Sequence, residues 1–129
     1  MVYTYDYDTD YSLGPPLPVV EFRVRAIGKD GGVSLQALVD SGADVTIIPL
    51  RYLEEAEVGH VGRAKMRWGS HESKNYDVYL TVIDIGPHTV HGVRLLADGR
   101  NRETILGRDV LNQIKIILNG PALVVEIED

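Results

Sequence analysis

The fold is decided by the stretch Ala37-Leu38-Val39-Asp40-Ser41-Gly42-Ala43-Asp44, in which an apolar strand pattern runs directly into an acid, a hydroxyl and a glycine. The end of a buried strand is an unfavourable place for a carboxylate, because taking a charge out of water costs free energy unless the charge has a partner. This pattern alone indicates a functional turn but does not identify its chemistry.

A second stretch has the same order of residue types: Thr104-Ile105-Leu106-Gly107-Arg108-Asp109-Val110-Leu111-Asn112-Gln113. An apolar pair leads into Gly107, which lies 67 positions after Asp40 (107 − 40), and a short helical pattern begins at the arginine. The neighbouring acids Asp109 and Glu103 are interpreted as solvated surface charges.

Together the two motifs resemble those of the retroviral-type aspartic proteases, the retropepsins. In that family an apolar pair, Asp, Thr or Ser, Gly and Ala form the catalytic turn, and an apolar pair, Gly and Arg later precede a helix. The resemblance covers roughly residues 19–127. It implies a mostly β fold: a closed β-barrel or sandwich of an acid protease half, with one short helix on the C-terminal side and a flap hairpin.

The resemblance also implies roles for the residues of the first motif. Asp40 would be the catalytic acid, and Ser41, in place of the commoner threonine, would hydrogen-bond to the backbone of a partner subunit. Gly42 would allow close backbone approach. Gly42, Ala43 and Asp44 would contact the substrate.

In the second motif, Ile105, Leu106 and Gly107 match the apolar pair and glycine of the family. Arg108 would form an internal ion pair with Asp44 that tethers the helix to the catalytic turn. If this pair is buried and bidentate, breaking one side should cost about 3–5 kcal/mol. The alternative is that the two residues are unrelated surface charges.

Hydrolysis of a peptide by an activated water needs one carboxylate to take a proton and a second, protonated carboxyl to donate one. A search for a second motif of this kind fails, because Asp30-Gly31 and Asp98-Gly99 lack the hydroxyl residue between the acid and the glycine. We therefore expect a homodimer in which Asp40 meets its symmetry mate, and an inactive monomer.

Alternating apolar residues indicate strands along most of the chain. Val20, Phe22, Val24 and Ala26 alternate with polar residues, and a glycine-rich turn at 28–32 leads into residues 33–39. This predicts a β-hairpin. Further strands are expected at residues 89–97, 114–118 and 123–127, and short helices at residues 50–57 and 108–113.

Residues 64–82 predict a second hairpin, which resembles the flap that closes over the substrate in retropepsins. Trp68, Gly69 and Ser70 are the candidates for its tip and for substrate contact. The alternative is an ordinary edge hairpin with Trp68 packed on the core.

Residues 1–18 differ from the rest, since tyrosine and aspartate alternate there and a proline-rich linker follows. We interpret 1–18 as an N-terminal arm and 19–129 as the protease-like domain. The arm is either a solvated tail or an adhesive segment that lies on the domain or in its cleft, where it could be cut in self-processing.

Composition excludes several functions. The chain has no cysteine, which removes disulfides, thiolate metal sites and cysteine nucleophiles. A net charge of −6 argues against a nucleic-acid partner. Neither a signal peptide nor a membrane span is apparent, so a cytoplasmic location without membrane contact is expected. No metal site and no cofactor are expected, because the histidines are scattered at His60, His71, His88 and His91.

The favoured hypothesis is a homodimeric aspartic endopeptidase that cleaves extended polypeptides with a water activated between Asp40 and its symmetry mate. The first alternative is a catalytically inactive, protease-like peptide-binding or dimerisation module, because a fold does not determine a function. The second is an inert structural β-domain. Dimer formation distinguishes the inert β-domain from the other two hypotheses. Cleavage that depends on Asp40 distinguishes the endopeptidase from the inactive module.

Overall fold

The computed structural model describes residues 1–67 and 73–129, which form ten strands and two short helices. In chain order the elements are β1 (Val2–Asp6), β2 (Val19–Arg25), β3 (Val33–Val39), β4 (Ile47–Pro49), α1 (Leu50–Glu55), β5 (Gly59–Met66), β6 (Lys74–Ile85), β7 (His88–Asp98), β8 (Ile105–Leu106), α2 (Arg108–Leu111), β9 (Lys115–Asn119) and β10 (Val124–Glu128).

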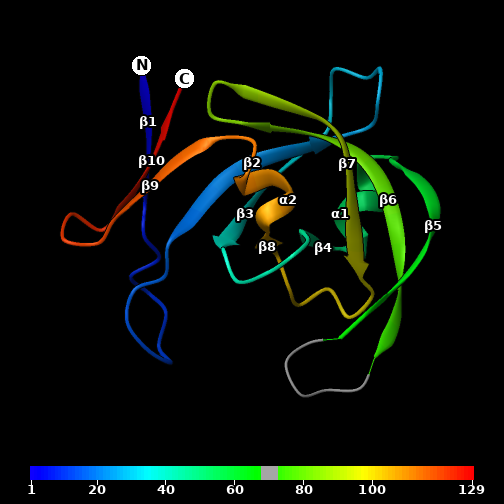
Figure 1. Cartoon of the computed structure of the whole chain (residues 1–129), viewed down its shortest axis with the longest axis horizontal. Coiled ribbons are helices and arrows are strands. Elements are labelled where there is room, and N and C mark those ends of the chain that lie inside the picture. Colours follow the sequence, from blue (N-terminus) through cyan, green and yellow to red (C-terminus); the bar gives the residue numbers. More distant parts are fainter. Residues whose placement is uncertain (68–72) are drawn as a thin grey trace.

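Seven strands form one curled sheet in the order β2-β3-β8-β4-β7-β6-β5 (Figure 1). An additional pairing of β2 with β6 turns this sheet into a barrel. The barrel is not strictly closed, because β8 has two residues and meets β4 at the single pair Ile47 and Ile105. The mostly β prediction is confirmed, and the expectation of a closed barrel is corrected at this seam.

The predicted first hairpin is confirmed, since β2 and β3 pair antiparallel. Val20, Phe22 and Val24 point into the core and are at most 3% exposed. Gly32 in the turn has φ +122°, and a Cβ there would lie 2.4 Å from the carbonyl oxygen of Val24. Only glycine fits this position without displacing the strand.

A separate sheet contains both chain ends, in the order β1-β10-β9. Figure 1 shows the two termini side by side, and the amino group of Met1 lies 2.7 Å from a carboxylate oxygen of Asp129. Tyr5 and Tyr7 pack against the hydrophobic core. Part of the tyrosine-rich segment therefore lies on the domain as a strand, while the boundary at residue 18 stays a prediction.

Both predicted helices form, each shorter than expected. α1 buries Leu53 at its centre, and α2 buries Val110 and Leu111. The helix on the C-terminal side is thus confirmed, and α1 is a second short helix. In the part of the chain that the structure describes, no helix has the length and apolar character to cross a membrane.

The second predicted hairpin consists of β5 and β6, which pair from Gly59 and Leu80 out to Met66 and Lys74. Its far half extends beyond the barrel, toward the bottom of Figure 1. Residues 68–70, the predicted tip with Trp68, Gly69 and Ser70, lie outside the described residues.

Candidate active site

Asp40 lies immediately after β3, where β3 runs parallel to β8. Leu38 pairs with Ile105 and Val39 with Leu106, and the Asp40 N–H donates to the Leu106 carbonyl at 3.1 Å. Two segments far apart in the sequence therefore lie side by side at the end of two short parallel strands. Asp40 is half-buried there.

The turn after Asp40 is fixed by its own backbone. The Gly42 N–H donates to Oδ1 of Asp40 at 2.9 Å, and the Ala43 N–H donates to the Asp40 carbonyl at 3.1 Å. A Cβ on Gly42 would lie 3.1 Å from that same Oδ1. Among residues 1–67 and 73–129, no hydrogen bond reaches Oδ2 of Asp40.

Gly107 allows the two motifs to meet backbone to backbone. A Cβ at this position would lie 2.5 Å from the carbonyl carbon and oxygen of Val45, and 3.0 Å from the Thr46 nitrogen. The Arg108 N–H continues the contact by donating to the Ala43 carbonyl at 2.9 Å. The second motif requires glycine here because no side chain fits between these segments.

A buried hydrogen-bond network joins the motifs a few residues further along. Thr46 is fully buried, its hydroxyl donates to Asp109 at 2.7 Å, and its N–H donates to the other carboxylate oxygen at 3.0 Å. The Gly107 N–H in turn donates to the Thr46 hydroxyl at 3.0 Å. The interpretation of Asp109 as a solvated surface charge is therefore wrong, whereas Glu103 is exposed.

Arg108 reaches the catalytic turn through two nitrogens. Nη1 donates to the Ser41 carbonyl at 2.7 Å, and Nη2 forms an ion pair with Asp44. The side chains of Arg108 and Asp44 are 40% and 69% exposed in this chain. The predicted ion pair forms, but in this chain it is exposed and not bidentate: one nitrogen contacts the carboxylate, and the other holds the turn through the backbone of Ser41.

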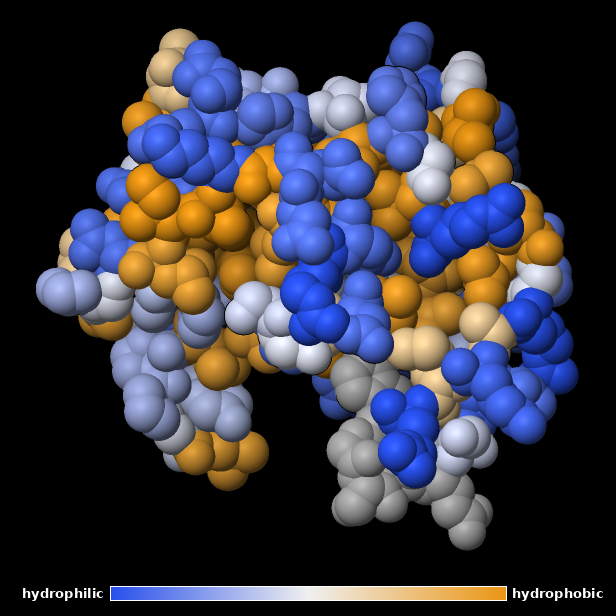
Figure 2. Space-filling model, in the orientation of Figure 1, coloured by the Kyte–Doolittle hydropathy of each residue, from blue (hydrophilic) through white to orange (hydrophobic). Residues whose placement is uncertain are grey.

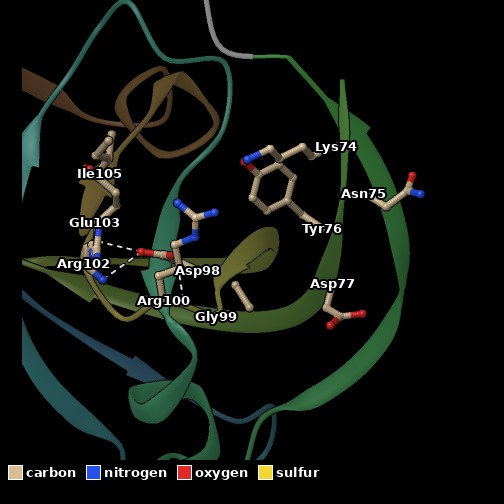
Figure 3. A pocket seen from close by; sticks show the side chains of 11 residues that line it. Lys74, Asn75, Tyr76, Asp77, Asp98, Gly99, Arg100, Arg102, Glu103 and Ile105 are labelled. Carbon is tan, nitrogen blue, oxygen red and sulfur yellow. Dashed lines mark hydrogen bonds between the residues drawn. The ribbon is translucent and has the colours of Figure 1, made fainter. Parts of the chain in front are cut away.

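Two pockets lie near this turn. The larger, of about 710 Å³, is lined by the start of β6 and by residues 97–105, which lead into β8 and so toward Asp40 (Figure 3). The smaller, of about 310 Å³, is mostly apolar and includes Val45, Met66, Val78 and Leu96. Both are lined by residues of the β5–β6 hairpin toward its far end and by segments that flank the two motifs.

The loop from β7 to β8 is organised by the carboxylate of Asp98. It accepts the backbone N–H groups of Arg100, Arg102 and Glu103 at 2.8–2.9 Å. Burial acts to raise the pKa of Asp98, but these three hydrogen bonds and the nearby Arg100 charge outweigh it and hold the pKa below its ordinary value.

The histidines of the described residues make scattered contacts. His60 lies 3.1 Å from Asp77 on the β5–β6 hairpin, and His88 lies 2.6 Å from the Glu128 carbonyl in the terminal sheet. In residues 1–67 and 73–129 no group of histidine and acidic side chains is arranged to hold a metal ion.

Comparison with known proteins agrees with the geometry. A family model described as gag-polyprotein putative aspartyl protease matches residues 28–113, which include both motifs. No curated protein sequence matches this chain.

Three solved structures share the fold. A retropepsin-like aspartic protease from Rickettsia conorii matches with a TM-score of 0.68 at 12% identity, over 98% of this chain and 89% of that one. The EIAV protease in complex with the inhibitor HBY-793 matches with a TM-score of 0.54 at 19% identity, over 80% of this chain and 91% of that one. The retroviral protease-like domain of Ddi1 from Leishmania major matches with a TM-score of 0.56 at 17% identity, over 88% of this chain and 89% of that one.

Proposed function

This chain belongs to the gag-polyprotein putative aspartyl protease family, and from that premise we propose that it is a homodimeric aspartic endopeptidase. The observation that carries the proposal is the setting of Asp40. The carboxylate is half-buried at the junction of two interlocked motifs, with one oxygen held by the turn and the other left for a reactant. One chain supplies a single such carboxylate, so the second comes from another copy.

In the proposed reaction the two Asp40 carboxyls share one proton. The ionised carboxylate takes a proton from water while the water oxygen attacks the peptide carbonyl carbon, and the protonated carboxyl gives its proton to the carbonyl oxygen. The tetrahedral product then collapses, the C–N bond breaks, and the leaving nitrogen takes a proton from the dyad.

Neighbouring residues have supporting roles in this proposal. Gly42 and Ala43 present backbone to an extended polypeptide, and Ser41 hydrogen-bonds to the partner's catalytic turn. Trp68, Gly69 and Ser70, which lie outside the described residues, stay candidates for substrate contact. No cofactor takes part.

The test is cleavage of a complex peptide library from acidic to neutral pH, read by mass spectrometry, with wild type, Asp40→Asn and Asp30→Asn. Asp30 is an exposed aspartate in the β2–β3 turn, so its variant controls for loss of a charge. We expect cleavage by wild type and by Asp30→Asn, and a loss of at least about 10⁴-fold in Asp40→Asn. Absence of cleavage by a wild-type protein shown to be dimeric would favour an inactive peptide-binding module.

A further inference from the structure

The larger pocket has charged walls on two sides. From β6 it is lined by Lys74, Asn75, Tyr76 and Asp77, and from the opposite loop by residues that include Arg100 and Arg102. In Figure 3 the side chains of Tyr76 and Lys74 face the loop across the opening. The lining also includes Ile105, which pairs with Leu38, two residues before Asp40 in the sequence. The pocket therefore shares a residue with the two paired strands that lead to Asp40.

Strand alternation decides which β6 side chains face the pocket. Successive residues of a strand point to opposite faces, so Lys74 and Tyr76 share one face while Asn75 and Asp77 share the other. Asp77 contacts His60 at 3.1 Å and Arg63 at 3.5 Å, two side chains of the neighbouring strand β5. Its negative charge is thus compensated on the outer face of the hairpin.

The second carboxylate of the pocket, Asp98, also has hydrogen-bond partners within the chain. It accepts three backbone N–H groups of its own loop, which hold the carboxylate in place but leave its negative charge, and the nearby charge of Arg100 acts on it. Glu103 is the third carboxylate of the lining, and it is exposed. In the part of the chain that the structure describes, Lys74, Arg100 and Arg102 form no ion pair, and with Asp77 paired on the outer face these three cations line the pocket beside two carboxylates.

The loop from β7 to β8, which carries Arg100 and Arg102, is fixed by hydrogen bonds. Besides the Asp98 contacts, the Asn101 N–H donates to the Asp98 carbonyl at 3.1 Å, and the Asn101 side chain accepts the Arg51 N–H at 3.0 Å. Asn101 has φ +56°, a left-handed conformation that asparagine tolerates better than most residues. The backbone that carries both arginines is therefore fixed to α1 before any ligand binds.

We propose that this pocket binds an acidic side chain of the polypeptide substrate, with Arg100, Arg102 and Lys74 facing its carboxylate. The inference rests on the proposed protease function and names the substrate class of the same site. The smaller pocket is lined mainly by apolar residues together with Arg63 and Arg94, so the proposal is confined to the larger pocket, where the loop from β7 to β8 fixes both arginines.

The first experiment measures binding and does not need catalysis. Immobilised Asp40→Asn protein is used to select from a random dodecapeptide display library, and Asp and Glu frequencies are counted at each aligned position. We expect acidic residues to be enriched at one position. Enrichment should disappear in Asp40→Asn carrying Arg100→Gln and Arg102→Gln, and it should persist with the control Lys65→Gln, an exposed lysine outside the pocket lining.

The second experiment compares matched Glu and Gln peptides with the wild-type enzyme. We expect kcat/KM to favour Glu by roughly 2- to 5-fold for each contacting cation, and the preference to weaken as salt is raised. In a variant with Arg100→Glu and Arg102→Glu the preference should shift toward Lys at that position.

The outcomes separate the two proposals. Cleavage that depends on Asp40 but is equal for Glu and Gln peptides would overturn the acidic pocket and leave the protease intact. Acidic enrichment without any cleavage would support the pocket and count against the protease. Retention of no peptide, or of peptides without acidic bias, would overturn the pocket.

Discussion

The catalytic turn and the far half of the β5–β6 hairpin are built in opposite ways. Around the turn, backbone contacts leave no space for a Cβ at Gly107, and Thr46 is fully buried. In the hairpin, residues 59–66 of β5 are exposed or half-buried throughout, and charged side chains line its outer face. Figure 2 shows apolar surface over the body of the domain, crossed by a strip of hydrophilic side chains.

The contrast shows which contacts hold each of the two regions in place. The turn is held by hydrogen bonds between two motifs distant in sequence, so its geometry is set before a ligand arrives. In the hairpin, β6 is held by β7 from Val78 to Ile85 and by β2 at its base, whereas the part beyond Val78 is held by the ladder between β5 and β6. The turn at Asp40 is therefore fixed by contacts from several elements, and the far half of the hairpin by one neighbouring strand.

The largest loss of stability is expected from a substitution at Gly107. Gly107→Ala would force Val45 and Thr46 away from the second motif and should lower the free energy of unfolding by about 3 kcal/mol, because overpacked backbone has no rotamer to relieve it. Urea unfolding measures this. Gly99→Ala is the matched control, with nothing within 4 Å of the added Cβ, and should change stability by less than about 0.5 kcal/mol. Equal effects of the two changes would refute the tight junction.

The next effect concerns the Thr46 hydroxyl. Thr46→Val keeps the shape but leaves the Gly107 N–H without its acceptor and removes one of the two donors to Oδ1 of Asp109, at a cost of about 2 kcal/mol. Thr81 is equally buried, but its hydroxyl only donates to the Val93 carbonyl. Thr81→Val should therefore cost about 1 kcal/mol or less. The same unfolding assay compares the two, and a larger loss in Thr81→Val would contradict the network.

The base of the hairpin gives a pH-dependent effect. Hydrogen bonds from Arg25, and then from Thr89 and Arg23, lower the pKa of Asp84 to about 2, against the opposing effect of burial. Because the folded pKa lies below the unfolded value, the carboxylate stabilises the fold above about pH 4, and this contribution is lost as pH falls toward 2.

Asp84→Asn should accordingly lower the free energy of unfolding by about 1–2 kcal/mol at pH 6. The difference from wild type should shrink at pH 2.5. Denaturant unfolding at both pH values measures it, with Asp10→Asn as the control for an exposed aspartate. A difference that stays constant with pH would show that Asp84 acts through packing and not through its charge.

The smallest effect is expected for the exposed ion pair. Asp44→Asn leaves the bond from Arg108 to the Ser41 carbonyl in place, so stability should fall by less than about 1 kcal/mol. A loss of 3 kcal/mol or more in thermal or urea unfolding would mean that assembly buries the pair, and the account of an exposed pair would be wrong.

The sequence predicted those features that are written in local patterns. Period-two alternation located β2 and β3, and the glycine-rich turn between them joined the pair correctly. The two short motifs located the segments that meet at Asp40. An apolar pair followed by Asp-Ser-Gly or by Gly-Arg is a distinctive pattern that can be read from a few residues.

Features that depend on distant partners were missed. Asp109 looks like a solvated acid in its own segment, and its role depends on Thr46, which becomes its neighbour only when β3 and β8 lie in parallel. The exposure of the Arg108–Asp44 pair depends on where the end of α2 meets the surface. Similarly, β1 pairs with β10 at the other end of the chain, and no local signal in the first residues indicates that contact.

The central claim is that two copies of Asp40 make one active site, and subunit mixing tests it most directly. Wild type and Asp40→Asn are unfolded together, refolded at varied ratios and assayed at constant total protein. If only dimers with two aspartates cleave, activity follows the square of the wild-type fraction and falls to about one quarter at equal mixing. Activity that falls to about one half, in proportion to the wild-type fraction, would show that each chain acts alone and would contradict the shared site.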